Sequence, residues 1–211
     1  MSGQDLAARI IERARLSEVH PTAPLASSLA SYLSLLAAWN KKINLTALDV
    51  GTPSDDAIDR LIVEPLVAAR QIRPTDGQLI DIGSGGGSPG LPVQLAAPHL
   101  RVVLVESKSR KAAFLQEACR HLSLTTAVEN CRAEELPARF QQSADVVTVR
   151  AVRPDRGLLS TIAALLRPGG RVFCFGGETI LESDLRTAGL TTAASVPLVR
   201  AGSSLLVLSG A

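Results

Sequence analysis

The segment DIGSGGGSPGLP, residues 81–92, places four glycines among the five residues from Gly83 to Gly87, directly behind a short apolar run. Each glycine costs about 0.5–1 kcal/mol relative to alanine in regular structure, so such a cluster needs a physical reason. Glycine is required where the backbone adopts a positive φ or where another group lies close to it. A plain strand-to-helix turn needs one or two glycines, so we expect a ligand to lie against this loop.

Two classes of cofactor are compatible with this loop. The residues from Gly85 to Gly90 satisfy the dinucleotide pattern G-x-G-x-x-G, and Glu106 lies about twenty residues further on. However, Gly85 comes two residues later than the pattern requires, and Pro89 lies inside the turn that would bind a pyrophosphate. Counted from Asp81, the segment instead reads D-x-G-x-G-x-G, the signature of S-adenosylmethionine-dependent methyltransferases. On this interpretation the glycines allow close approach of the amino-acid and ribose parts of the cofactor.

The elements around this loop fall into two regimes. Up to about Arg70, apolar residues recur at the three- and four-residue spacing of helices. This spacing predicts helices over three segments, residues 5–16, 25–48 and 50–72. A linker with two prolines, residues 17–24, separates the first two helices. We therefore expect an N-terminal helical extension over residues 1–75.

From Leu79 onward, short runs rich in Val, Ile and Leu alternate with helical stretches. Strands are predicted at residues 79–82, 101–107, 125–131, 145–151, 171–175, 195–200 and 203–210. Helices are predicted at residues 90–97, 109–122, 133–140 and 154–166. This alternation indicates an α/β domain over residues 76–211, with a mostly parallel sheet and helices on both faces. The last two strands have no long helix between them, which predicts an antiparallel edge.

Polar side chains follow several of the predicted strands. In open α/β sheets, ligands bind in the crevice outside the carboxyl ends of the strands. Glu106 follows the second strand, where its carboxylate would either accept hydrogen bonds from two ribose hydroxyls or simply be solvated. Glu134, beside the apolar Ala133, lies either at the edge of an adenine or in the acidic first turn of a helix. Arg150 follows the fourth strand, so all these loops should meet in one crevice.

Two groups of basic residues lie near this crevice. Lys108, Arg110 and Lys111 crowd the start of a predicted helix, the end at which the helix dipole disfavours cations. They form either a patch that faces phosphates or a set of solvated side chains. Lys41 and Lys42 lie in a polar stretch within the second predicted helix. We expect this stretch to cover the crevice and to offer both lysines to phosphates.

The composition argues against several other classes of protein. With 211 residues, 46% of them hydrophobic, the chain can bury the core of one domain. A net charge of +2 and 3% aromatic residues disfavour a free-standing nucleic-acid binder and a base-stacking platform. The three cysteines lack metal-ligand spacing, so we expect reduced thiols and no metal. The chain has no apolar run of the roughly 18–20 residues that a membrane span needs, and no signal peptide. We therefore expect a cytoplasmic protein without a membrane anchor.

Five blocks of the sequence together resemble the bacterial ribosomal small-subunit methyltransferase G family, also called GidB. They are, in order, WNKKINLTAL, DIGSGGGSPGLP, LVESKSRKAAFLQEACRHLSL, CRAEEL and VTVRAV, and the resemblance runs from about Tyr32 to Glu178. It implies a class I, Rossmann-like methyltransferase fold with S-adenosylmethionine as cofactor. It also implies that the protein methylates ring nitrogen seven of a guanosine in small-subunit (16S) ribosomal RNA. The partner would be this RNA or the 30S subunit, and the protein is expected to be a monomer.

The resemblance also assigns roles to individual positions. Matched to the motifs, the cofactor contacts of the family fall on Gly83, Ser88, Ala133, Glu134 and Arg150. Gly85 and Glu106 join them from the loop pattern. Arg150, at the mouth of the crevice, is the expected catalytic residue; it would hold the cofactor carboxylate or the RNA, or else form a structural ion pair. The expected RNA contacts are Lys41, Lys42, Arg60, Lys108, Arg110 and Lys111.

The chain departs from the family at three places. The family often has a large apolar residue where this chain has Ser88. The lysine-glycine pair expected after the fifth strand reads Gly176-Gly177, which removes a cation near the substrate. The family motif RHxxDS reads RLIVEP, which keeps Arg60 and places Leu61, Glu64 and Pro65 where histidine, aspartate and serine are usual. The competing interpretations are an NAD-dependent oxidoreductase and a non-catalytic, ribosome-associated protein that retains the pocket.

Overall fold

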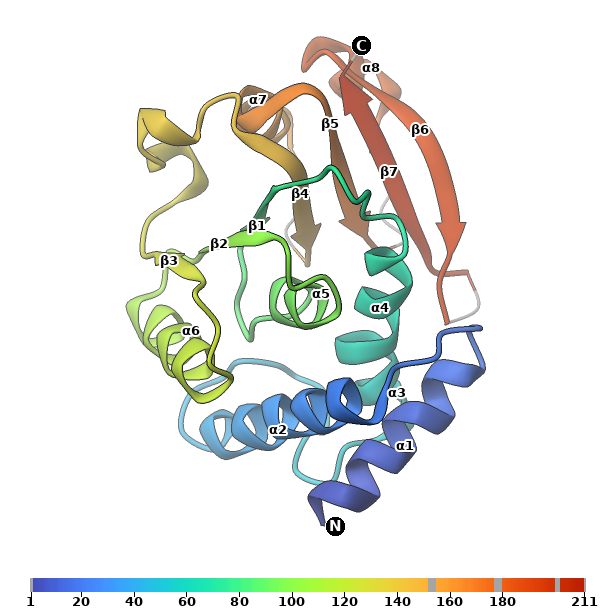
Figure 1. Ribbon diagram of the computed structural model, residues 1–211. Helices are drawn as coiled ribbons and strands as arrows, with labels where there is room; N and C mark the ends of the chain where they lie inside the picture. The colour runs from blue at the N-terminus through green and yellow to red at the C-terminus, as the bar shows by residue number, and fades with distance from the viewer. Residues whose placement is uncertain (1, 152–154, 177–179, 200–201, 211) are drawn as a thin grey trace.

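A computed structural model describes residues 2–151, 155–176, 180–199 and 202–210 (Figure 1). Its centre is a seven-stranded sheet in the order β3-β2-β1-β4-β5-β7-β6. The strands are β1 (Gln78–Ile82), β2 (Arg101–Val105), β3 (Ala127–Glu129), β4 (Ala144–Arg150), β5 (Leu166–Phe175), β6 (Leu190–Pro197) and β7 (Ser204–Gly210). The first five strands pair in parallel, whereas β7 is antiparallel to both β5 and β6. The predicted α/β fold with an antiparallel edge is therefore confirmed.

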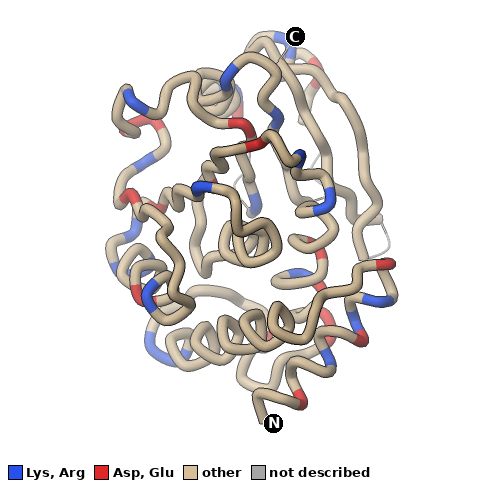
Figure 2. The backbone as a smooth tube through the Cα atoms, viewed as in Figure 1, with Lys and Arg blue, Asp and Glu red and all other residues tan. Residues whose placement is uncertain are grey.

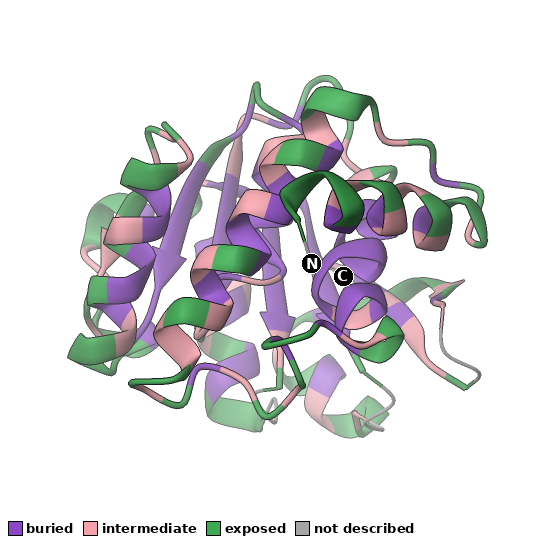
Figure 3. Cartoon of the chain, turned by 90° about the horizontal axis from the view of Figure 1, so that it is seen from below, coloured by how far each residue is buried: buried purple, intermediate pink, exposed green. Residues whose placement is uncertain are grey.

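Alternating residues of the strands build two cores, one on each face of the sheet. Leu79 and Val102 face one core, while their neighbours Ile80 and Val103 face the other. Helices α5 (Gly90–Ala96) and α6 (Ser109–His121) cover the first face. Helices α7 (Arg156–Leu165) and α8 (Glu182–Thr187) cover the second, and Figure 3 shows the buried strands between these layers. Helices on both faces bury the central parallel strands, whereas β6 forms an exposed edge of the sheet.

The N-terminal helices share the first core with the sheet. Helix α1 (Gly3–Arg15) packs against α2 (Ala23–Asn40), which in turn packs beside α5 and α6 (Figure 1). Buried residues such as Leu29 and Leu33 belong to the same cluster as Leu79. The helix predicted over residues 25–48 ends earlier, at Asn40. The side chain of Asn40 accepts hydrogen bonds from the backbone N–H groups of Leu45 and Thr46 and so holds the following loop in a turn. The division of the chain at residue 75 stays a prediction.

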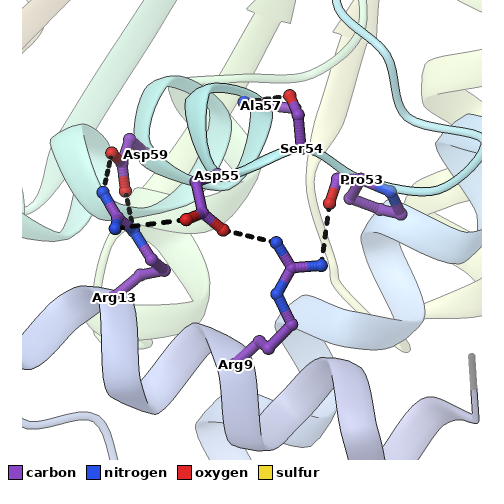
Figure 4. Close-up of polar contacts among 7 residues, drawn as sticks. All are labelled: Arg9, Arg13, Pro53, Ser54, Asp55, Ala57 and Asp59. Atoms are coloured by element: carbon purple, nitrogen blue, oxygen red, sulfur yellow. Dashed lines mark hydrogen bonds and ion pairs between the residues drawn. The ribbon is translucent and has the colours of Figure 1, made fainter.

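The third N-terminal helix contains a wide turn. It comprises α3 (Asp55–Ile58), the π-helical turn η1 (Asp59–Val63) and α4 (Glu64–Ala69). Helix α1 holds this segment from outside through ion pairs of Arg9 with Asp55 and of Arg13 with Asp59 (Figure 4). Asp59 is buried, so its pairing with Arg13 fixes the start of the wide turn.

Two other predicted elements differ from the structure, and one observed helix was not predicted. The helix expected at residues 133–140 is two 3₁₀ turns, η2 (Ala133–Glu135) and η3 (Ala138–Phe140), because Pro137 between them has no N–H to continue a helix. The strand expected at residues 195–200 begins earlier, at Leu190, where its polar residues lie at an exposed edge of the sheet. Helix α8 has no counterpart among the predicted elements.

No helix among the described residues is long and apolar enough to cross a membrane.

Candidate active site

A cavity of about 570 Å³ lies at the carboxyl ends of β1, β2 and β4. Here the sheet order reverses, because β1 pairs with β2 on one side and β4 on the other. The predicted residues that line this cavity are Arg60, Gly83, Gly85, Ser88, Glu106, Lys108, Lys111 and Arg150. Its wall also includes residues that the sequence analysis did not select, Leu36, Leu45, Thr46, Ala47 and Leu48. The turn organised by Asn40 carries most of these residues, so the expectation that this stretch covers the crevice agrees with its position.

The backbone of the glycine turn explains why the glycines are needed. Gly83, Gly85 and Gly87 have φ values of 69°, 52° and 89°, a region that side chains rarely adopt. A Cβ on Gly90 would lie 2.6 Å from Leu104 and 2.8 Å from the Asp81 carboxylate, so this glycine allows α5 to approach β1. The turn also lines the cavity, but its glycines already have reasons within the chain. The glycine cluster alone therefore does not prove a ligand.

Glu106 ties the glycine turn to the end of β2. Its two carboxylate oxygens accept hydrogen bonds from the backbone N–H groups of Gly85, at 3.0 Å, and Lys108, at 2.7 Å. The carbonyl of Val105 accepts two more bonds, from the N–H groups of Gly83 and Ser84. Each carboxylate oxygen retains a lone pair, so Glu106 can still accept a hydroxyl of a bound ligand.

A second cavity, of about 300 Å³, adjoins this larger one, because Gly83 and Ser107 line both. Ala133 and Glu134 lie in its wall, as expected for an adenine site, and Ile82, Val105 and Leu158 make it apolar. Its lining also includes Ser107, Cys131, Arg132 and Asp155, for which the sequence suggested no role. Apolar side chains beside carboxylates can hold a purine ring and accept hydrogen bonds from an exocyclic amine.

Arg150, at the end of β4, stands at a junction of three segments. Its Nη2 donates to Glu64 Oε2 at 2.8 Å, and its Nη1 donates to the carbonyl of Arg60 and, at 3.3 Å, to Ser88 Oγ. The guanidinium also lies 4.3 Å from the ring centre of Phe175. Burial lowers the pKa of Arg150 to about 10, and the nearby Glu64 opposes this shift, so the side chain remains charged at neutral pH.

Part of this junction compensates for the backbone N–H that Pro65 lacks. Since proline has no N–H, it cannot donate to the carbonyl of Leu61 in an α-helix or of Arg60 in a π-helix. Both carbonyls nevertheless accept a hydrogen bond, because Ser88 Oγ donates to Leu61 at 2.9 Å and Arg150 donates to Arg60. Pro65 and Ser88, two of the residues that depart from the family pattern, thus compensate each other.

Two further buried polar side chains lie beside the glycine turn. The hydroxyl of Tyr32, in α2, donates to the carbonyl of Gly86 at 2.6 Å. Asp81 Oδ1 accepts from Thr148 Oγ1 at 2.6 Å, while Asp81 Oδ2 has no hydrogen-bond partner among the described residues. Burial raises the pKa of Asp81 to about 6, although the Thr148 bond opposes this shift. The single tyrosine and the aspartate that begins the glycine motif are the sequence signals for these roles.

The predicted RNA-binding residues separate into two sets. Lys108 and Lys111 line the larger cavity, and so does Arg60. The other three, Lys41, Lys42 and Arg110, are exposed and line neither of the two cavities. Figure 2 shows basic and acidic positions interspersed along the described chain.

Gly176 cannot simply be replaced by the lysine of the family. It is exposed and has a φ of 129°, which a lysine would adopt only with strain. Its neighbour Gly177 lies outside the described residues.

The described residues contain no group of three or more His, Cys, Asp or Glu that could hold a metal ion.

Known proteins match both the sequence and the fold. The family described as GidB, rRNA small subunit methyltransferase G, matches residues 25–196. Proteins named ribosomal RNA small subunit methyltransferase G are similar to the chain at 40% identity. They come from Xanthomonas euvesicatoria pv. vesicatoria and Stenotrophomonas maltophilia, and the match covers 74% of this chain and 70% of each relative.

Solved methyltransferase structures share the fold at low identity. The mitomycin 7-O-methyltransferase MmcR has a TM-score of 0.60 at 18% identity, over 100% of this chain and 69% of its own. The O-methyltransferase NcsB1, solved with S-adenosylmethionine, has a TM-score of 0.57 at 17% identity, over 68% of this chain and 52% of its own. The fold is thus that of the class I S-adenosylmethionine-dependent methyltransferases. The chain belongs to the rRNA small subunit methyltransferase G (GidB) family.

Proposed function

We propose that the protein transfers the methyl group of S-adenosylmethionine to ring nitrogen seven of a guanosine in small-subunit (16S) ribosomal RNA, in the cytoplasm. The observation that carries this proposal is the pair of adjoining cavities at the switch point of the sheet, in a chain of the GidB family. No observation of the site favours an NAD-dependent oxidoreductase.

The residues present fit S-adenosylmethionine along the length of the two cavities. The smaller, apolar cavity with Ala133 and Glu134 suits the adenine. Glu106, at the junction, suits the ribose hydroxyls, and the turn from Gly83 to Ser88 suits the amino-acid end. By contrast, Pro89 follows a cis peptide bond within the turn and offers no N–H to a pyrophosphate.

The proposed chemistry asks little of the side chains. When bound, S-adenosylmethionine supplies a methyl group on a positively charged sulfur, and the lone pair of guanine N7 displaces that sulfur. N7 carries no proton, so no base is needed, and the positive charge passes from sulfur to the purine. The chain's own task is to hold the base in line and to exclude water, and the leucines of the larger cavity suit this task.

The proposed substrate requires contacts outside the cavities. Lys108 and Lys111 lie at the rim where a flipped-out base would enter, and phosphates on either side of that base would meet them. We extend the RNA contact to the exposed Lys41, Lys42 and Arg110. Since the chain carries only a small net charge, these local cations would supply most of the attraction.

Transfer of labelled methyl groups from S-adenosylmethionine to purified small subunits that lack the modification tests the proposal. The wild type should label the RNA, and Ala133→Trp should abolish labelling because its indole fills the smaller cavity. Ala138→Trp is a matched control, because Ala138 is exposed on the next 3₁₀ turn and lines neither cavity. Absence of labelling by the folded wild type, with subunits and with free RNA, would contradict the proposal.

A further inference from the structure

Helix α1 holds the third N-terminal helix through two arginines whose surroundings differ (Figure 4). Arg13 donates to both carboxylate oxygens of Asp59, and the two side chains are 23% and 7% exposed. Arg9 pairs with Asp55, and those side chains are 33% and 54% exposed. Removing one partner of a buried pair leaves an uncompensated charge, whereas water screens an exposed pair. Asp59 therefore depends on Arg13 more than Asp55 depends on Arg9.

The π-helical turn η1 connects this ion pair to the larger cavity. Asp59 is the first residue of the turn, and the next two residues, Arg60 and Leu61, line the cavity. The carbonyl of Arg60 accepts a hydrogen bond from Arg150, and the carbonyl of Leu61 accepts one from Ser88 Oγ at 2.9 Å. Arg150 and Ser88 line the same cavity. One turn thus contacts α1 at its first residue and two residues of the cavity wall through its next two carbonyls.

The third N-terminal helix cannot satisfy these two carbonyls by itself. Pro65 has no N–H to donate to them, so both depend on side chains of other segments. A shift of the turn would therefore break its bonds to Ser88 and Arg150 or move both side chains with it. Helix α1, which holds the turn through Arg13, ends before the residues that match the GidB family. The family resemblance thus assigns no role to Arg13.

We infer that Arg13 is a positioning residue for methyl transfer, because through Asp59 it holds the wide turn that keeps Ser88 and Arg150 in the cavity wall. The inference rests on the proposed function and leaves the cofactor contact of Arg150 where the family resemblance places it. Arg13 itself lines neither cavity, so it acts only through the turn. Small displacements of positioning groups are costly for binding and catalysis. Loss of Arg13 should therefore weaken cofactor binding in a protein that remains folded.

Calorimetry with S-adenosylhomocysteine tests the inference in the full chain. Arg13→Gln should weaken binding by about fivefold or more, and Arg13→Lys, which keeps the charge, should recover part of this loss. Arg9→Gln is the matched control for an ion pair of the same helix and should stay within about twofold of the wild type. Ile10→Val, at a fully buried position of α1, controls for a general loss of stability and should also stay within about twofold.

A double variant and steady-state kinetics separate positioning from a merely structural role. Adding Asp59→Asn to Arg13→Gln removes the unpaired buried carboxylate, so the double variant should bind S-adenosylhomocysteine more tightly than Arg13→Gln alone. Methyl transfer by Arg13→Gln should show a raised KM for S-adenosylmethionine and an unchanged KM for small subunits.

Three results would overturn the inference alone. They are wild-type affinity in Arg13→Gln, an equal loss of affinity in Ile10→Val, and a raised KM for subunits without a change for S-adenosylmethionine. The last result would place α1 on the RNA. A folded wild type that does not bind S-adenosylhomocysteine overturns the proposed function as well.

Discussion

Asp81 is a carboxyl group placed where water cannot reach it. It is 1% exposed, accepts a hydrogen bond from Thr148 on one oxygen and lies against Gly90, beneath the glycine turn. Burial raises its pKa from the usual 3.8 to about 6, despite the hydrogen bond from Thr148. Such a group favours the folded state when it is protonated, because the unfolded chain gives up the proton more readily.

The pH dependence of stability tests this environment. The contribution of Asp81 to the free energy of unfolding is fully present below about pH 4 and is lost as the pH rises through about 6. The shift corresponds to about 3 kcal/mol in the free energy of unfolding. Asp81→Asn cannot ionise at this position. Between pH 4 and pH 8, the free energy of unfolding of the wild type should therefore fall by about 3 kcal/mol relative to that of Asp81→Asn. Urea unfolding of both proteins at a series of pH values measures the difference, and parallel curves would refute a raised pKa.

Ser88 and Pro65 offer a second test at the residue scale. Ser88→Leu restores the apolar residue usual in the family but removes the donor to the Leu61 carbonyl, which Pro65 cannot replace. We expect a loss of about 1–2 kcal/mol in the free energy of unfolding. Adding Pro65→Ser returns an N–H to the helix and should recover most of this loss. Equal destabilisation of the single and double variants would show that the two positions are not coupled.

At the scale of elements, helix α2 supports the glycine turn that lines the proposed cofactor site. Tyr32 is fully buried and donates to the carbonyl of Gly86, against which Leu36 and Leu45 also pack. Tyr32→Phe should weaken binding of S-adenosylhomocysteine several-fold, because the turn loses its only side-chain hydrogen bond from α2 among the described residues. Ser28→Ala, on the exposed face of the same helix, removes a hydroxyl without touching the turn and serves as control. Calorimetry measures the affinity of the two variants for S-adenosylhomocysteine. Equal affinities would contradict a supporting role for α2.

Local pattern was sufficient to predict most of the strands and the loops at their carboxyl ends, but it misplaced β6. Apolar runs and the D-x-G-x-G-x-G motif brought Gly83, Glu106 and Arg150 to one crevice, where the structure also has them. The contacts of Arg150 with Glu64 and of Tyr32 with Gly86 join residues 86 and 54 positions apart, and no local pattern specifies such pairs. The end of α2 was missed because Asn40 stops the helix through bonds to residues that follow it.

At the scale of the whole molecule, one core unites the N-terminal helices with the sheet. Tyr32 of α2 donates to the glycine turn, and Arg13 of α1 holds the wide turn before α4. Leu36 of α2 lines the larger cavity. The N-terminal helices therefore help to form or support the wall of the proposed cofactor site. Lys108 and Lys111 also line this cavity, and we propose that they contact the RNA.

The modified nucleoside itself tests the central claim most directly. Small subunits that lack the modification are incubated with the protein and S-adenosylmethionine, and the digested ribosomal RNA is analysed by liquid chromatography and mass spectrometry. We predict that 7-methylguanosine appears at about one per subunit, and that it does not appear with Ala133→Trp. A methyl group on another atom or another base, or no methylated nucleoside at all, would contradict methylation of guanosine at nitrogen seven.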